Sequence, residues 1–273
     1  MAERGATTTD EKPLPTIWRV PDELWERVEP ILDEHDPPKK TGRPRVDRRD
    51  VLDAVVFRLR TGCQWNRLPK EFPNDSTVHR VFQGWVELGV LDRIWAALIE
   101  ECEELGGVSW EWQAVDGAMG KARFGGTSFG PNPTDRAKKG VKRSLLVEAD
   151  GGPLSVVIAG ANVRDDKLLA QTLDEVVVER PEPTEEAPQN LCLDKGYDNK
   201  GSREIARERS YVSHIRRIGE EKLDEAREKR YPARRWVVER TLAWLSKCRS
   251  ILVRYEKKTA NHLGLVKVAC ILI

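Results

Sequence analysis

Three acidic residues are the chain's best candidates for chemistry: Asp116, Asp194 and Glu239. The two aspartates share a local setting, because each follows a short apolar run and precedes a glycine, in VDG at 115–117 and in LDKG at 193–196. A strand end holds a carboxylate rigidly at a sheet edge, and a neighbouring glycine lets a ligand or metal approach the backbone. For either aspartate alone an ordinary Asx turn is the simpler interpretation. The recurrence of the setting favours a site.

Glu239 lies in the run RWVVER at 235–240, at the border of the apolar face of an expected helix. Arg235 precedes it by about one helical turn, so a surface ion pair worth about 0.3–0.5 kcal/mol is the alternative interpretation. Other acidic residues nearby could replace it as the third ligand: Glu220, Glu221, Asp224 and Glu225.

Such a trio of carboxylates suits chemistry on phosphodiester bonds. In-line attack requires an activated water or 3′-hydroxyl and a neutralised leaving oxygen, which two Mg²⁺ ions about 3.5–4 Å apart can supply. The four histidines show no zinc-binding spacing, and the chain has no P-loop. We therefore expect Asp116, Asp194 and Glu239 to be catalytic and to bind two Mg²⁺ ions, with Mn²⁺ as a substitute.

Composition limits the class of protein. The 273 residues, 39% hydrophobic and 33% charged, predict a packed core in one large or two ordinary domains. Because 46 basic and 45 acidic residues nearly cancel, nucleic-acid binding would show only in the local distribution of charge. The five cysteines lack CxxC spacing, and neither a secretion signal nor an apolar run of about 20 residues is present. The expected location is the cytoplasm.

The N-terminal part predicts a small helical DNA-binding domain. Residues 1–15 are expected to be a disordered lead, and residues 16–106 to form helices beginning near 22, 50, 75 and 91. The break at Thr61-Gly62 resembles a helix-turn-helix, with a plain helical bundle as the alternative. In the first interpretation a major groove would be contacted by Thr77, His79, Arg80 and Gln83.

Residues 107–273 predict an α/β domain. Strands are expected at 110–115, 142–149, 154–159, 191–193 and 211–215, the second and third joined by a tight turn at 150–153. Helices are expected at 165–178, 221–229 and 232–249, followed by an apolar tail from 262. An acidic, proline-rich surface loop occupies 180–188.

Basic side chains gather where DNA phosphates would lie, although a solvated surface is the alternative for each group. The first group is an arm that contains Arg43, Arg45, Arg48 and Arg49. The second leads into the expected hairpin and contains Arg136, Lys138, Lys139, Lys142 and Arg143. The third surrounds Glu239 and contains Lys229, Arg230, Arg234, Arg235 and Arg240.

In their joint order these motifs resemble the DDE transposases of bacterial insertion sequences, specifically the insertion-sequence-five group. The helical part matches with GRPR at 42–45, LRTGCQW at 59–65, LP at 68–69 and FQGW at 82–85. The catalytic part matches with VDG at 115–117, KG at 139–140, DGGP at 150–153, AN at 161–162 and LDKGYD at 193–198. The third block matches with VER at 238–240, WL at 244–245 and RYE at 254–256.

The resemblance, which extends from about residue 18 to the end, implies a ribonuclease-H-like catalytic core. It implies that Asp116, Asp194 and Glu239 are the metal-binding triad. The family signature also expects Tyr and Lys at two positions where this chain has Pro232 and Ser246, with Tyr231 and Lys247 one residue away. This departure affects auxiliary DNA contacts more than the glutamate. Because relatives usually run slightly beyond the apolar helix that ends here at Ile273, C-terminal truncation is an open alternative.

The sequence therefore predicts a transposase that cleaves at the terminal inverted repeats of its element and transfers the strands into target DNA. Double-stranded DNA is the expected partner, and synapsis of two ends implies a homodimer on DNA. The alternatives are a nuclease of the same superfamily and a domesticated or inactive DNA-binding protein.

Overall fold

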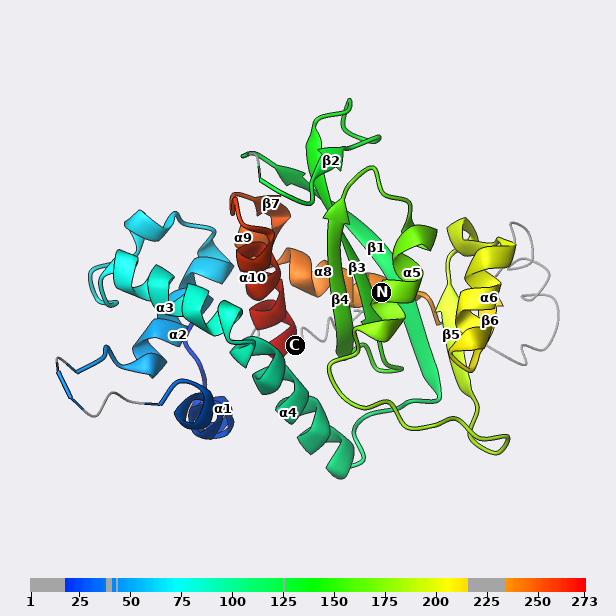
Figure 1. The fold of residues 1–273 in the computed structure, drawn as a ribbon, viewed down its shortest axis with the longest axis horizontal. Coiled ribbons are helices and arrows are strands. Elements are labelled where there is room, and N and C mark those ends of the chain that lie inside the picture. Colours follow the sequence, from blue (N-terminus) through cyan, green and yellow to red (C-terminus); the bar gives the residue numbers. More distant parts are fainter. Residues whose placement is uncertain (1–17, 38–40, 43, 125, 216–233) are drawn as a thin grey trace, which may run out of the picture.

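The computed structural model describes residues 18–37, 41–42, 44–124, 126–215 and 234–273 (Figure 1). Its helices are α1 (Asp22–His35), α2 (Arg48–Thr61), α3 (Asp75–Glu87), α4 (Val90–Glu104), α5 (Asp165–Asp174), α6 (Lys200–Glu208), α8 (Trp236–Ser246), α9 (Arg249–Leu252) and α10 (Thr259–Ile271), with short 3₁₀ turns η1 (Trp65–Arg67) and η2 (Lys195–Tyr197). Its strands are β1 (Trp112–Ala122), β2 (Gly130–Pro131), β3 (Lys139–Val147), β4 (Pro153–Gly160), β5 (Gln189–Leu193), β6 (Tyr211–Ile215) and β7 (Val253–Arg254).

Within the described residues, the strands form one mixed sheet. The long central strand β1 pairs antiparallel with β3, which pairs antiparallel with β4, and on its other side β1 pairs parallel with β5, which pairs parallel with β6. The β3–β4 turn is fixed by the Glu148 carboxylate, which accepts hydrogen bonds from the backbone N–H groups of Asp150 (2.9 Å) and Gly152 (2.6 Å). The parallel strands require crossover connections, and α5 and α6 supply them.

Alternating side chains divide the sheet into two apolar faces. Val115, Leu146 and Leu193 pack with α5 and α6, whereas Ala114 and Cys192 belong to the core that includes α8 and α10. Figure 1 shows α5 in front of the sheet and α8 behind it. The sheet is thus covered by helices on both faces, and the parity of a residue in its strand determines which helices it meets.

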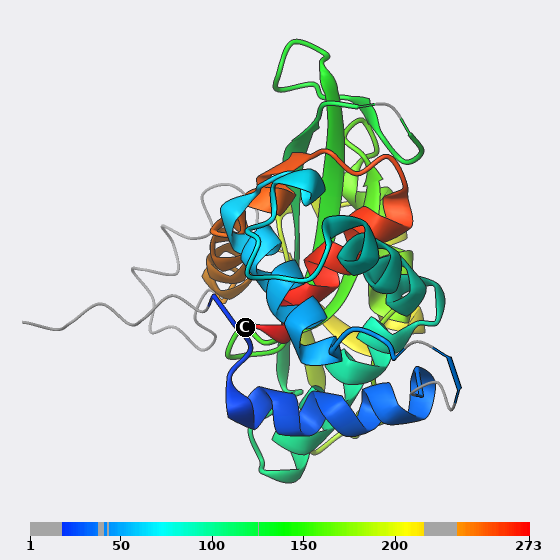
Figure 2. The same ribbon diagram turned by 90° about the vertical axis from the view of Figure 1, so that its left-hand side faces the viewer.

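The four N-terminal helices share their core with the C-terminal end of the chain. Helix α10 packs against α2, α3 and α4, and one apolar cluster continues from these helices to the α8 face of the sheet. Figure 2 shows the N-terminal helices in front of the red α10. Described residues from both ranges, 16–106 and 107–273, contribute to this core. The division of the chain into two domains at these bounds stays a prediction.

The structure corrects several expected elements. The strand predicted at 110–115 continues to Ala122, because β3 goes on pairing with it as far as Lys121. Helix α6 was not predicted, and the helix expected at 221–229 lies outside the described residues. The strand at 211–215 is confirmed with the expected bounds. Among the described helices, none is long and apolar enough to cross a membrane.

Candidate active site

The register of the sheet places Asp116 beside Asp194. The last parallel pair between β1 and β5 joins Val115 to Leu193, so each aspartate is the next residue along its strand. Neighbouring strands lie about 4.8 Å apart, which makes these two carboxylates close neighbours at the carboxyl end of the β1–β5 ladder. They occupy equivalent positions, although Asp116 lies inside a long strand and only Asp194 lies at a strand end.

Both aspartates have the strand parity of the α8 face. Asp116 alternates with Ala114, and Asp194 alternates with Cys192, both of which belong to the core under α8. Gly117 points to the opposite face, where a Cβ atom would lie 2.2 Å from Asp165 Oδ1 at the start of α5. The glycine of the VDG motif therefore makes room for a packed side chain, whereas the sequence suggested room for a ligand.

Helix α8 supplies the third carboxylate. Its buried face, which includes Val238 and Leu242, packs against the sheet, and Glu239 lies on the exposed side. The Glu239 carboxylate forms an ion pair with Arg235 at 2.5 Å, one turn earlier on the chain. The predicted alternative, an Arg235–Glu239 pair, is thus present, and the two interpretations coexist.

The pKa of Asp116 responds to its burial and to the charges around it. Burial raises the pKa of Asp116, and the negative charges of Asp194 and Glu239 raise it further. The Gly117 backbone N–H, which donates to Asp116 Oδ1 at 2.7 Å, and the Arg235 guanidinium act in the opposite direction. Asp116 is therefore an acidic group whose ionised form is disfavoured by its surroundings.

Oxygen donors in this arrangement fit a hard divalent cation, which would relieve the repulsion among the carboxylates. They do not yet form a tight ligand cluster: within the described ranges, no group of three His, Cys, Asp or Glu side chains is close enough to hold a metal ion. Like charges repel, and Arg235 holds Glu239 in its ion pair. Closing the site would require Glu239 to exchange this partner.

The predicted basic arm is largely neutralised within the protein. Arg45 pairs with Asp36, Arg48 with Asp33 and Arg49 with Asp22, so all three arginines meet acidic residues of α1 or its C-terminal end. Arg43 lies outside the described residues. The DNA contacts predicted for this arm stay a prediction, and they would have to compete with these ion pairs.

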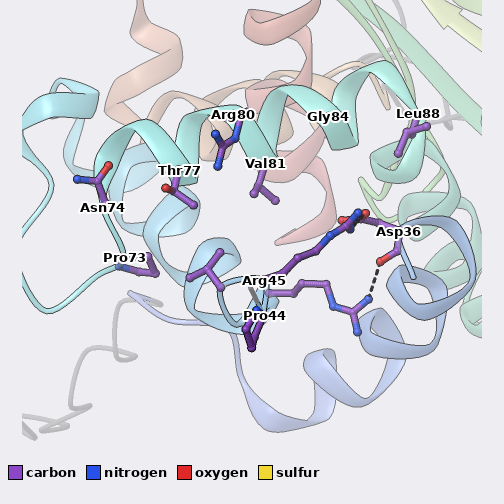
Figure 3. Close-up of a pocket in the computed structure, with 12 residues that line it drawn as sticks. Asp36, Pro44, Arg45, Pro73, Asn74, Thr77, Arg80, Val81, Gly84 and Leu88 are labelled. Carbon is purple, nitrogen blue, oxygen red and sulfur yellow. Dashed lines mark hydrogen bonds and ion pairs between the residues drawn. The ribbon is translucent and has the colours of Figure 1, made fainter. Parts of the chain in front are cut away.

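Helix α3 borders a groove of about 940 Å³. Thr77 and Arg80 line it together with Arg45, and Figure 3 shows Thr77, Arg80 and Val81 extending from α3 toward the arm. His79 differs, because its ring stacks on Trp65 with 4.6 Å between ring centroids and burial lowers its pKa. The structure gives His79 a packing contact, and its predicted major-groove contact stays a prediction.

Two residues predicted to bind DNA are buried. Lys142 is 5% exposed and pairs with Asp165 at 3.0 Å, and Arg143 is 2% exposed and donates to the Ile251 carbonyl at 2.5 Å. A DNA phosphate cannot reach either group in this structure, so both predictions are wrong. The strand alternation explains the error, since the basic run simply enters the sheet.

The remaining predicted cations are at least partly accessible. Lys138 and Lys139 are exposed where the β2–β3 connection enters β3, and Figure 1 shows β2 in the projection at the top of the molecule. Arg240 stacks between Trp236 and Trp244, with 4.8 Å and 4.7 Å from its guanidinium carbon to the two ring centroids.

Asp165, which pairs with Lys142 behind Gly117, was missed by the sequence analysis, because two aspartates at a helix start indicate only a favourable helix N-terminus.

Comparison with protein families identifies the chain. Residues 20–95 match the family model described as "Putative transposase of IS4/5 family", and residues 113–273 match the model described as "Transposase DDE domain". A "Putative transposase for insertion sequence element IS402" from Burkholderia cepacia is 34% identical over 154 residues, which are 55% of this chain and 70% of the relative. A 16.2 kDa protein of the same element is 32% identical over 118 residues, which are 42% of this chain and 80% of the relative.

Comparison with solved structures gives weaker matches. The Mos1 mariner paired-end complex with Mn is 10% identical, with 89% of this chain and 90% of that chain covered and a TM-score of 0.26. The Mos1 strand-transfer complex is 9% identical, with 86% and 80% covered and a TM-score of 0.26.

The chain belongs to the DDE transposases, and within them to the IS4/5 family. It is a DNA transposase, an enzyme of DNA recombination. Members of this class act on DNA and depend on divalent metal ions.

Proposed function

We propose that Asp116, Asp194 and Glu239 are the catalytic carboxylates and hold two Mg²⁺ ions, with Mn²⁺ as a substitute. The observation that carries the proposal is the convergence of the two equivalent β1 and β5 positions on the sheet face that α8 covers. The raised pKa of Asp116, to which Asp194 and Glu239 both contribute, supports the same grouping. The ions would activate the attacking oxygen and neutralise the leaving oxygen.

The strand order supports a ribonuclease-H-like core for this part of the chain. On one side of β1 lies its antiparallel partner β3, with β4 beyond it, and on the other side β5 and β6 continue the sheet in parallel, an order that suits such a core. Asp116 lies on the central strand β1, and Asp194 directly follows the parallel neighbour β5. Residues 16–106 would then be the DNA-binding domain that recognises the element ends.

The chain's own groups would orient the DNA and release Glu239. Arg235 already binds a carboxylate, so a DNA phosphate that attracts its guanidinium would free Glu239 for the metal ions. The exposed Lys138 and Lys139, and Arg80 beside the α3 groove, would contact phosphates. The enzyme would cleave at the terminal inverted repeats in the cytoplasm and join the freed 3′-hydroxyls to target DNA, as a homodimer on two ends.

The test is a cleavage and strand-transfer assay on end DNA with Mg²⁺. Wild type is compared with Asp116→Asn, Asp194→Asn and Glu239→Gln, and with Asp174→Asn as a carboxylate control, because Asp174 only pairs with Arg209 on the surface. We expect both reactions to fall by at least about a thousandfold (about 4 kcal/mol of barrier) in the three site variants and to persist in the control. Activity in the Glu239→Gln enzyme would show that the third metal ligand is another residue. Cleavage without strand transfer by wild type would indicate a nuclease.

A further inference from the structure

A second groove, of about 580 Å³, lies where the end of α2 meets the connection between α8 and α9. Its cations are Arg60, Lys247 and Arg249, and we therefore call it the cationic groove. Trp18 and Trp244 also line it, and its apolar lining includes Ala269 of α10 and the two residues that follow this helix, Leu272 and Ile273. Among the described residues that line it, none is acidic.

Within the part of the chain that the structure describes, the three cations have no acidic partners. None of the ion pairs among the described residues involves Arg60, Lys247 or Arg249. This distinguishes them from Arg45 and Arg48 at the α3 groove, which pair with Asp36 and Asp33. Three unpaired positive charges around one concave surface create a potential that attracts a polyanion.

The cationic groove continues the exposed face of the helix that carries Glu239. Arg240, Trp244 and Lys247 are spaced by four and three residues, so they lie along one side of α8. At 1.5 Å per residue, Lys247 lies about 12 Å along the axis from Glu239. A DNA duplex covers this distance with about three to four base pairs at 3.4 Å each.

The groove is held rigidly by close packing between its walls. Gly62 ends α2 in the left-handed region (φ +71°), and a Cβ atom there would lie 2.9 Å from the Arg249 Cβ. The buried Ser250 hydroxyl donates to the Arg58 carbonyl at 2.7 Å, which ties α9 to α2. The backbone positions of the cations are therefore fixed before any ligand arrives, which reduces the entropy lost on binding.

We propose that the cationic groove binds backbone phosphates of the transposon-end duplex on its way from the catalytic carboxylates to the N-terminal helices. The groove is walled by α2 from the N-terminal helices and by α8, so a duplex lying in it touches both regions at once. This geometry favours end DNA, which both regions must hold, over target DNA. The inference rests on the proposed function, because it takes Glu239 as part of the active site.

The test measures binding of the full chain to a labelled end duplex by fluorescence anisotropy, without divalent metal, over a range of salt concentrations. The triple variant Arg60→Gln, Lys247→Gln, Arg249→Gln is compared with Lys200→Gln, Arg203→Gln, Arg207→Gln. The control removes three positive charges from α6, which lies on the other face of the sheet. We expect the slope of log K against log salt to become shallower by about 2.7 in the groove variant, at about 0.9 per lost phosphate contact, and to change little in the control.

A folded groove variant with the wild-type slope would overturn the inference. Because Arg60 is partly buried and donates to Cys248 Sγ, the double variant Lys247→Gln, Arg249→Gln provides a version confined to exposed residues, with an expected change of about 1.8. Binding without metal is independent of the catalytic carboxylates. Normal binding by wild type with no cleavage would therefore count against the proposed function and leave the inference standing.

Discussion

Two charged clusters in this protein differ in how their charges are compensated. At the junction between α2 and the C-terminal segment, Arg58 and Glu256 are 5% and 8% exposed and form an ion pair at 2.6 Å. The Trp65 indole N–H also donates to Glu256, at 3.1 Å, and the Arg58 guanidinium lies 4.2 Å from the centroid of the Trp65 ring. At the carboxylate edge of the sheet, Asp116 instead meets two like charges, Asp194 and Glu239.

The comparison distinguishes charged groups that are paired with an opposite charge from charged groups that repel one another. The junction pairs two opposite charges, so removing one partner would leave the other buried and uncompensated. The carboxylate edge brings three acidic groups together, and although Arg235 pairs with Glu239, the pKa of Asp116 is still raised, which costs stability unless a further cation is bound. Unfavourable, converging carboxylates on rigid strands are therefore a better indication of a site than ion pairs are.

The largest effect should come from breaking the junction. Glu256→Ala leaves the Arg58 guanidinium buried without its carboxylate, so we expect a loss of about 3–5 kcal/mol of unfolding free energy. The control is Glu87→Ala, which removes an exposed partner of Lys258 and should cost less than about 1 kcal/mol. Denaturant unfolding monitored by circular dichroism measures both. A Glu256→Ala cost within the range of the control would show that the junction is not the stabilising cluster.

A smaller effect should come from filling the space behind the carboxylate edge. Gly117→Ala places a methyl group against the Asp165 carboxylate, and overpacking of this kind costs about 1–3 kcal/mol. Asp165→Ala in the same chain should restore part of the loss, because it removes the clashing oxygen. Gly196→Ala is the matched control, since the nearest atom to its added Cβ is 4.0 Å away. Equal costs at the two glycines would refute the packing role of Gly117.

A third prediction concerns pH. Because the pKa of Asp116 is raised in the folded protein, mainly by burial, its protonated form is favoured by folding, and this contribution is lost as the pH rises through the folded pKa. In metal-free buffer, Asp116→Asn should therefore raise the Tm at neutral pH, by a few degrees, and this gain should shrink on acidification. Asp174 should behave oppositely, because its hydrogen bond with Arg209 lowers its pKa. Thermal melts across pH would contradict the assignment if Asp116→Asn destabilised the protein at neutral pH.

The smallest effect compares single paired and unpaired cations on DNA. Lys247→Gln should reduce the salt slope of end binding by about 0.9, whereas Arg48→Gln should reduce it by less, because Asp33 already neutralises Arg48. The anisotropy titration described above resolves the two. A larger change at Arg48 would mean that its ion pair opens on DNA.

Local patterns predicted most of the elements and the three carboxylates. Helical periodicity located α1 to α4, and the DGGP turn located the β3–β4 hairpin. Asp116 and Asp194 were predicted from their neighbours, and their adjacency follows from a strand register that only the fold reveals. Their roles stay a prediction until they are tested.

Long-range features could not be predicted in this way. Burial of Lys142 and Arg143 depends on the strand alternation and on α5 and α9 covering the two faces, which no local window contains. The cationic groove combines Arg60 with Lys247 and Arg249, which are far apart in the sequence. Charge runs indicate where cations occur, but the acidic residues of α1 that neutralise the arm are visible only in three dimensions.

The most direct test of the site is Mn²⁺ binding to the full chain on an end duplex that cannot be cleaved, because DNA is needed to release Glu239 from Arg235; electron paramagnetic resonance measures it. We expect wild type to bind Mn²⁺, and Asp116→Asn, Asp194→Asn and Glu239→Gln each to weaken binding by more than about tenfold, since even outer-shell partners are worth 10–100-fold. Asp174→Asn should bind as wild type does. Undiminished binding in any of the three would remove that residue from the site, and undiminished binding in all three would contradict the assignment of the carboxylate edge as the metal centre.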